Sequence, residues 1–61
     1  MKIFFNLKDN SESNKIEFEE IVKTFGTIVD SRANGNETLY TLKFTSVQDC
    51  MEFGNAALSF K

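Results

Sequence analysis

Histidine, proline and tryptophan are absent from this chain of 61 residues, and cysteine occurs once. Without histidine the chain lacks the usual general base and the commonest metal ligand. Aspartate and glutamate alone could still hold Mg²⁺ or Ca²⁺, but their spacing does not resemble an EF-hand loop. We therefore expect no enzymatic activity, no catalytic residue, no metal site and no cofactor.

The single cysteine, Cys50, cannot form a disulfide within one chain, and a lone cysteine favours a reducing compartment. Cys50 falls on an apolar helical stripe with no histidine to activate its thiol, so a buried structural cysteine is favoured over a reactive one. No apolar run approaches the roughly 18 residues that a membrane span needs, and the N-terminus lacks a secretion signal. We expect a cytoplasmic protein with no membrane partner.

An excess of positive charge is also missing. Seven basic and nine acidic side chains give a net charge of −2, so no general field holds a phosphate backbone, and nucleic acid is a disfavoured partner. The chain is 41% apolar with seven phenylalanines, which is typical of a folded domain. We expect residues 1–61 to form one small domain, which buries only about 60% of its unfolded surface.

The first half of the chain predicts a strand followed by a helix. Residues 2–7 form a short run rich in β-forming side chains. Further on, four apolar residues recur at i, i+3, i+4 and i+7, on the side of a helix that faces a core: Phe18, Ile21, Val22 and Phe25. Ser11, Ser13 or Asn14 could cap this helix, Asn14 with Glu17 as a capping box. Gly26 ends it and suits the left-handed position after a helix.

A hairpin is predicted next. Residues 27–32 form a short run that begins with three β-branched side chains. Asn34-Gly35 is the pair most compatible with a tight turn into a strand at residues 38–45. Alternation in that last strand puts three side chains on the expected core face: Tyr40, Leu42 and Phe44.

A second helix is predicted after the hairpin, with Ser46 as its cap. Helical spacing turns five residues inward, the last two as further candidates: Cys50, Phe53, Ala57, Met51 and Leu58. Gly54 weakens the centre of this helix and suggests a close contact with the sheet.

The predicted order is β-α-β-β-α, a split βαβ unit of the α+β class. A helix between the first two strands implies that these strands run parallel, with the third strand inserted antiparallel between them. We therefore predict a three-stranded mixed sheet of order 1-3-2 with two helices on one face.

Several segments of this pattern resemble the RNA-recognition motif. Residues 18–28 are similar to the first helix of that family and its F-G-x-I exit, and residues 3–7 (I-F-F-N-L) resemble its first-strand motif. Residues 42–46, followed by Asp49-Cys50, resemble the end of its third strand and the start of its second helix. The resemblance implies a sheet whose open face stacks aromatic side chains on the bases of single-stranded RNA.

The chain departs from the family at the positions that would bind RNA. Alignment on Phe44 puts Glu37 where the family has a basic residue, and Leu39 and Thr41 where it has stacking aromatics. In the first strand the stacking position falls on Ile3, or on Phe4 after a shift by one residue. At most one stacking aromatic remains, so binding of RNA by a degenerate module of this kind is our alternative hypothesis.

A fourth strand, which in the family lies beside the first, is missing from the predicted elements. The first strand then becomes a sheet edge that can pair with another chain, a second copy or a target protein. The partner-binding residues predicted on this strand and on the open face are Ile3, Phe5, Leu39, Thr41 and Lys43. If the pleat of the first strand is inverted, Ile3 and Phe5 belong to the core instead.

An acidic face is predicted on the first helix: Glu17, Glu19 and Glu20. It could imitate nucleic-acid phosphates and occupy a basic site on an enzyme. The favoured interpretation is a solvated surface on which Glu19 forms i, i+4 pairs with Lys15 and Lys23.

We therefore predict a non-enzymatic protein-binding module whose partner is another protein or itself. Its brevity, acidity and lack of catalytic groups are typical of small regulatory or inhibitory proteins that viruses of bacteria direct against host enzymes or defence systems.

Overall fold

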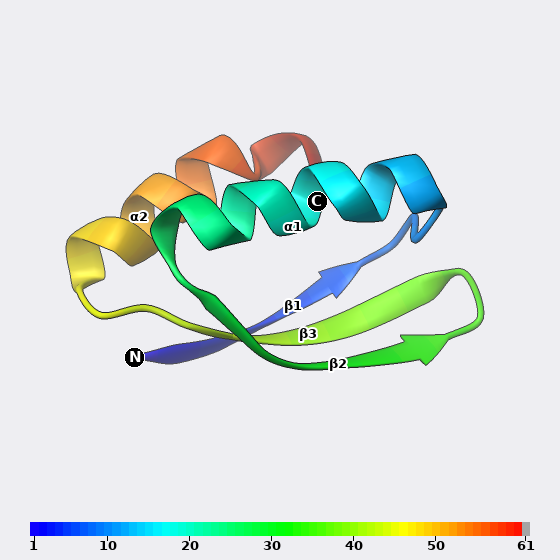
Figure 1. Ribbon diagram of the computed structural model, residues 1–61, viewed down its shortest axis with the longest axis horizontal. Helices are drawn as coiled ribbons and strands as arrows, with labels where there is room; N and C mark the ends of the chain where they lie inside the picture. Colours follow the sequence, from blue (N-terminus) through cyan, green and yellow to red (C-terminus); the bar gives the residue numbers. More distant parts are fainter. Residues whose placement is uncertain (61) are drawn as a thin grey trace.

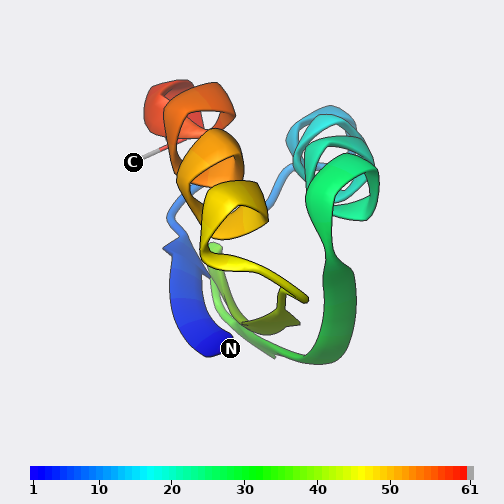
Figure 2. The same ribbon diagram turned by 90° about the vertical axis from the view of Figure 1, so that its left-hand side faces the viewer.

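The computed structural model describes residues 1–60. Its elements are β1 (Lys2–Leu7), α1 (Glu12–Phe25), β2 (Thr27–Asn34), β3 (Glu37–Lys43), α2 (Val47–Ala56) and a short 3₁₀ helix, η1 (Leu58–Phe60). Both α-helices cover the same face of the sheet, and the other face is left open (Figures 1 and 2). The predicted β-α-β-β-α order is confirmed. No helix in the described part of the chain is long and apolar enough to cross a membrane.

The central strand of the sheet is β3, which pairs antiparallel with β1 on one side and with β2 on the other. The predicted strand order 1-3-2 is confirmed. The expectation of a mixed sheet is wrong, because β1 and β2 run in the same direction but are separated by β3. All the strand pairs that the structure describes are therefore antiparallel.

Phe18 of α1 lies at the centre of the core. Its ring centroid is 4.8 Å from that of Phe5, 4.9 Å from Tyr40, 5.5 Å from Phe60 and 5.9 Å from Phe53. The buried apolar residues come from both α-helices, from β1 and β3, and from the positions directly after β3 and α2: Phe5, Leu7, Phe18, Val22, Tyr40, Leu42, Phe44, Phe53 and Ala57. The predicted core face of the last strand is thus confirmed.

Both ends of α1 differ in detail from the prediction. The cap is Ser11, one of the three candidates, and the Asn14 capping box is wrong because the Asn14 side chain donates to the carbonyl of Asp9 instead. Gly26 ends the helix as predicted, but in an extended conformation (φ −160°) rather than a left-handed one. Glycine is needed there because a Cβ atom would lie 2.5 Å from the carbonyl oxygen of Lys43.

The hairpin turn is shifted by one residue from the predicted pair. Asn34 pairs with Glu37, so the two-residue loop is Gly35-Asn36. Gly35 has φ +63° and is the one residue with positive φ in residues 1–60. This pattern fits a type II′ turn, which places glycine at its first central position.

In α2 the predicted cap is confirmed, because the Ser46 hydroxyl accepts from the amide of Asp49 at 3.1 Å. The inward orientation of Met51 and Leu58 is wrong: these side chains are 62% and 61% exposed. Met51 lies two positions from buried Phe53 and therefore on the opposite side of the helix. The close contact expected at Gly54 is also wrong, since a Cβ atom there would meet nothing within 4 Å.

Candidate functional site

The pleat of β1 decides which of its side chains reach the open face. Phe5 is buried and Ile3 is half-buried against the core, whereas Phe4 is 72% exposed. Ile3 and Phe5 lie opposite Leu42 and Tyr40, and directly opposed residues share a face. The predicted placement of Ile3 and Phe5 on the open face is therefore wrong. The inverted pleat, the alternative considered for this strand, is the one found.

Phe4 takes the place of those two residues at the centre of the open face. It lies opposite Thr41, and Leu39 is the next residue along β3 on the same face. Leu39 is 45% exposed and Thr41 is half-buried, so their predicted placement on this face is confirmed. We call Phe4, Leu39 and Thr41 the open-face patch.

The open face has a positive end and a negative end. At one end Lys2 lies directly opposite Lys43, and both are exposed. At the other end the Asn6 side-chain amide donates to Glu37 Oε1 at 2.8 Å. Like charges placed directly opposite each other destabilise a strand pair, so the two lysines favour an incoming negative group.

The outer edge of β1 is free in the part of the chain that the structure describes (Figure 2). Met1 and Phe44 exchange two backbone hydrogen bonds, of 2.8 Å and 3.0 Å. Hydrogen-bonded pairs alternate along an antiparallel ladder, so Ile3, Phe5 and Leu7 also bond to β3. The backbone N–H and C=O groups that point outward, to the free edge, are those of Lys2, Phe4 and Asn6.

The second sheet edge, that of β2, is irregular. A bulge at Val29 interrupts its pairing with β3 between Ile28 and Asp30. Bulges twist an edge and hinder the addition of another strand. Beyond the bulge, Asp30 and Arg32 form an exposed ion pair of 3.2 Å. The edge of β1 carries no such interruption over its six residues.

The acidic residues of α1 do not act as one group. Glu19 Oε2 accepts a hydrogen bond of 2.8 Å from the hydroxyl of Tyr40. Burial is the larger cause, and this hydrogen bond to Glu19 the smaller one, of a pKa of Tyr40 raised above its usual range. The expected ion pairs of Glu19 with Lys15 and Lys23 are not formed. The one ion pair within residues 1–60 is Arg32–Asp30. Sequence analysis missed the Glu19–Tyr40 bond because its partners are 21 positions apart.

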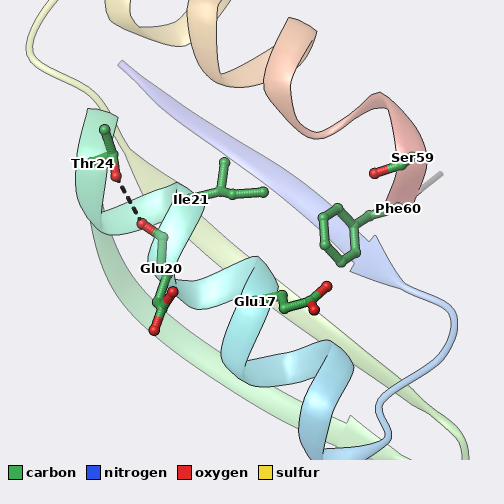
Figure 3. A pocket seen from close by; sticks show the side chains of 6 residues that line it. All are labelled: Glu17, Glu20, Ile21, Thr24, Ser59 and Phe60. Atoms are coloured by element: carbon green, nitrogen blue, oxygen red, sulfur yellow. Dashed lines mark hydrogen bonds between the residues drawn. The ribbon is translucent and has the colours of Figure 1, made fainter.

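Glu17 and Glu20 remain exposed at a groove of about 450 Å³ between α1 and η1. Figure 3 shows its lining, in which Ile21 and Phe60 supply apolar surface. The Thr24 hydroxyl donates to the carbonyl of Glu20 at 3.0 Å, so its hydrogen bond is made within α1. Within residues 1–60 no group of three or more acidic, cysteine or histidine side chains could hold a metal ion.

Cys50 is half-buried and packs against the core from α2. The cysteine therefore contributes to the packing of α2 against the core, although it is half-buried rather than buried as predicted.

Asn10 is a structural residue that sequence analysis also missed. Its backbone amide donates to the carbonyl of Asn36 at 2.9 Å, and its side-chain amide donates to the carbonyl of Gly35 at 3.0 Å. Asn10 thus fastens the β1–α1 loop to the hairpin turn. Its position in a polar loop is the only feature of the sequence that points to this role.

Comparisons with protein-family models, with curated proteins and with solved structures found no match. The class that the fold and the surface define is a small α+β domain of β-α-β-β-α topology with an open sheet face. The resemblance to the RNA-recognition motif extends to this topology, and no family follows from it.

Proposed function

We propose that this chain is a non-enzymatic protein-binding module that engages its partner through the open-face patch and the free edge of β1. The observation that carries the proposal is Phe4, a large apolar side chain 72% exposed in the middle of an edge strand. Exposed apolar side chains that cluster, as Phe4 does with Leu39, mark interaction surfaces on soluble domains.

Two modes of recognition combine at this surface. A partner strand added to the edge of β1 would gain hydrogen bonds to the outward backbone groups of Lys2, Phe4 and Asn6. Side chains of the patch would add specificity, with Lys43 at the positive end of the face. Ile3 and Phe5, which we first assigned to partner binding, support the surface from the core side.

The module acts as a small regulatory or inhibitory protein, of the sort that viruses of bacteria direct against host enzymes or defence systems. A net charge of −2 and the lack of a histidine general base support this part of the proposal.

Photo-crosslinking tests the proposal. A benzophenone amino acid replaces Phe4, and a matched sample carries it at Ile16, which is 52% exposed on α1. We expect irradiation in extract to join the position-4 sample to a discrete protein, identified by mass spectrometry, and to leave the Ile16 sample largely unjoined. Equal yields of the same product from both positions would contradict the assignment of the surface.

Binding of single-stranded RNA is the second candidate, and one observation favours it. Phe4 could stack on a base while Lys2 and Lys43, at the same end of the face, contact phosphates. Against it, Leu39 and Thr41 stand where further aromatics would be, and Arg32 is paired with Asp30. A salt titration of labelled RNA decides: binding at low salt that Phe4→Ala abolishes supports RNA, and no binding at any salt removes it.

A further inference from the structure

We propose that the free edge of β1 pairs antiparallel with the same edge of a second copy, about a two-fold axis at Phe4. The three strands of each copy then join into one sheet of six. This inference rests on the proposed function in one respect, because both use the edge of β1 as a pairing site.

The alternation of backbone hydrogen bonds fixes the register. Only Lys2, Phe4 and Asn6 direct their N–H and C=O groups to the free edge, so these residues must meet one another in any antiparallel pairing. One two-fold register uses all three: Phe4 opposite Phe4 of the second copy, and Lys2 opposite Asn6. In registers shifted by two residues, at least one of these residues has no hydrogen-bonding partner in the β1 strand of the second copy.

Charge is complementary in this register. Lys2 of one copy comes to lie opposite Asn6 of the other, whose side chain holds Glu37 at 2.8 Å. The positive end of each open face thus meets the negative end of its partner, twice by symmetry. The repulsion between Lys2 and Lys43 within each copy is offset at the same time.

The two phenylalanine rings complete the contact. Phe4 projects from the open face beside the axis, so the two rings become cross-strand neighbours on the same face. Aromatic pairs at opposed positions stabilise strand pairing. The same symmetry places the helices of both copies on one side of the sheet and both open-face patches on the other.

The edge of β2 does not offer an equivalent site. The bulge at Val29 breaks its hydrogen-bond pattern, whereas β1 pairs regularly from Lys2 to Leu7. Self-pairing therefore closes the regular edge and leaves the irregular ones at the two ends of the joined sheet, which limits further growth.

Charge reversal provides the test, read by analytical ultracentrifugation over a concentration series. We expect the wild-type protein to change reversibly from 7.0 kDa to about 14 kDa, twice the mass of one chain. Lys2→Glu or Glu37→Lys alone should raise the dissociation constant several-fold, because each puts like charges together twice. An equimolar mixture of the two single variants should form a heterodimer, and the double variant should recover the homodimer.

A backbone variant tests the register. Phe4→Pro removes an amide that points to the free edge, whereas Phe4→Ala removes the ring and keeps that amide. We expect Phe4→Ala to weaken the dimer and Phe4→Pro to abolish it. Phe5→Pro is unsuitable, because the Phe5 amide belongs to the ladder with Tyr40 and its loss would damage the fold. Circular dichroism and thermal unfolding check that each variant remains folded.

A monomer at millimolar concentration would overturn self-pairing. So would a dimer that persists unchanged in Phe4→Pro and in both charge variants, which would place the interface elsewhere. The two proposals can be contradicted separately. A monomer that still crosslinks to a different protein from position 4 would contradict self-pairing alone. A dimer that crosslinks only to itself would contradict the proposal that the module binds another protein.

Discussion

Tyr40 shows how a single side chain connects the two layers of this fold. It extends from β3 into the core, is fully buried, and donates its hydroxyl hydrogen to Glu19 on α1 at 2.8 Å. It is the only tyrosine in the chain, and tryptophan is absent. Its ultraviolet absorbance therefore reports on this one bond without interference.

Alkaline titration should reveal that bond. The pKa of Tyr40 is raised in the folded state above the usual value of about 10, so the folded protein holds its proton more tightly than the unfolded chain does. The contribution of Tyr40 to the free energy of unfolding is thus present in full below about pH 10 and falls as the pH rises further. We expect phenolate absorbance to appear together with the loss of circular dichroism.

The matched variant is Tyr40→Phe, which keeps the ring and removes the hydroxyl. It should lower the free energy of unfolding by about 1 kcal/mol at neutral pH and flatten the decline above pH 10. Ionisation of Tyr40 near its usual pKa in a protein that stays folded would show that the bond to Glu19 is not formed.

At the scale of elements, periodicity carried most of the information in the sequence. The helical repeat of Phe18 and Val22 and the alternation of Tyr40 and Leu42 gave the correct inward faces of α1 and β3. Strand order followed from topology, because a helix-linked pair of strands leaves room for a third between them. These features depend on patterns that extend over several residues.

The faces of β1 could not be derived in the same way, because Ile3, Phe4 and Phe5 are apolar without alternation. The residues on either side decide the pleat: Lys2 and Asn6 share the face of Phe4, so turning Phe4 inward would bury a charge and an amide. The hairpin loop was displaced for a similar reason, since Gly35 can serve either of two neighbouring turn types.

Alanine substitution of two adjacent phenylalanines tests this pleat. Phe5 is 9% exposed and its ring centroid lies 4.8 Å from that of Phe18, so Phe5→Ala should cost about 3–4 kcal/mol of unfolding free energy. Phe4→Ala should cost less than about 1 kcal/mol, because its side chain is exposed. Urea unfolding of dilute samples measures both. Equal losses would mean that Phe4 is also packed in the core.

On the scale of the whole molecule, the sheet is the incomplete layer. Two helices cover one face, while the other face and the regular edge of β1 have no cover within residues 1–60 (Figure 2). A domain of this size has little surplus stability, so an apolar side chain and unpaired backbone groups left at a surface favour association. The same incomplete layer supports both proposals, a protein partner and a second copy.

Residue-resolved amide hydrogen exchange tests the central claim, that the edge of β1 is open until a partner strand covers it. In a dilute sample the amides of Phe4 and Asn6 should exchange rapidly while those of Ile3, Phe5 and Leu7 are protected by β3. Protection of the Phe4 amide should then rise with protein concentration, or when the protein identified by photo-crosslinking is added. A Phe4 amide as slow as that of Phe5 in the dilute monomer would contradict the account.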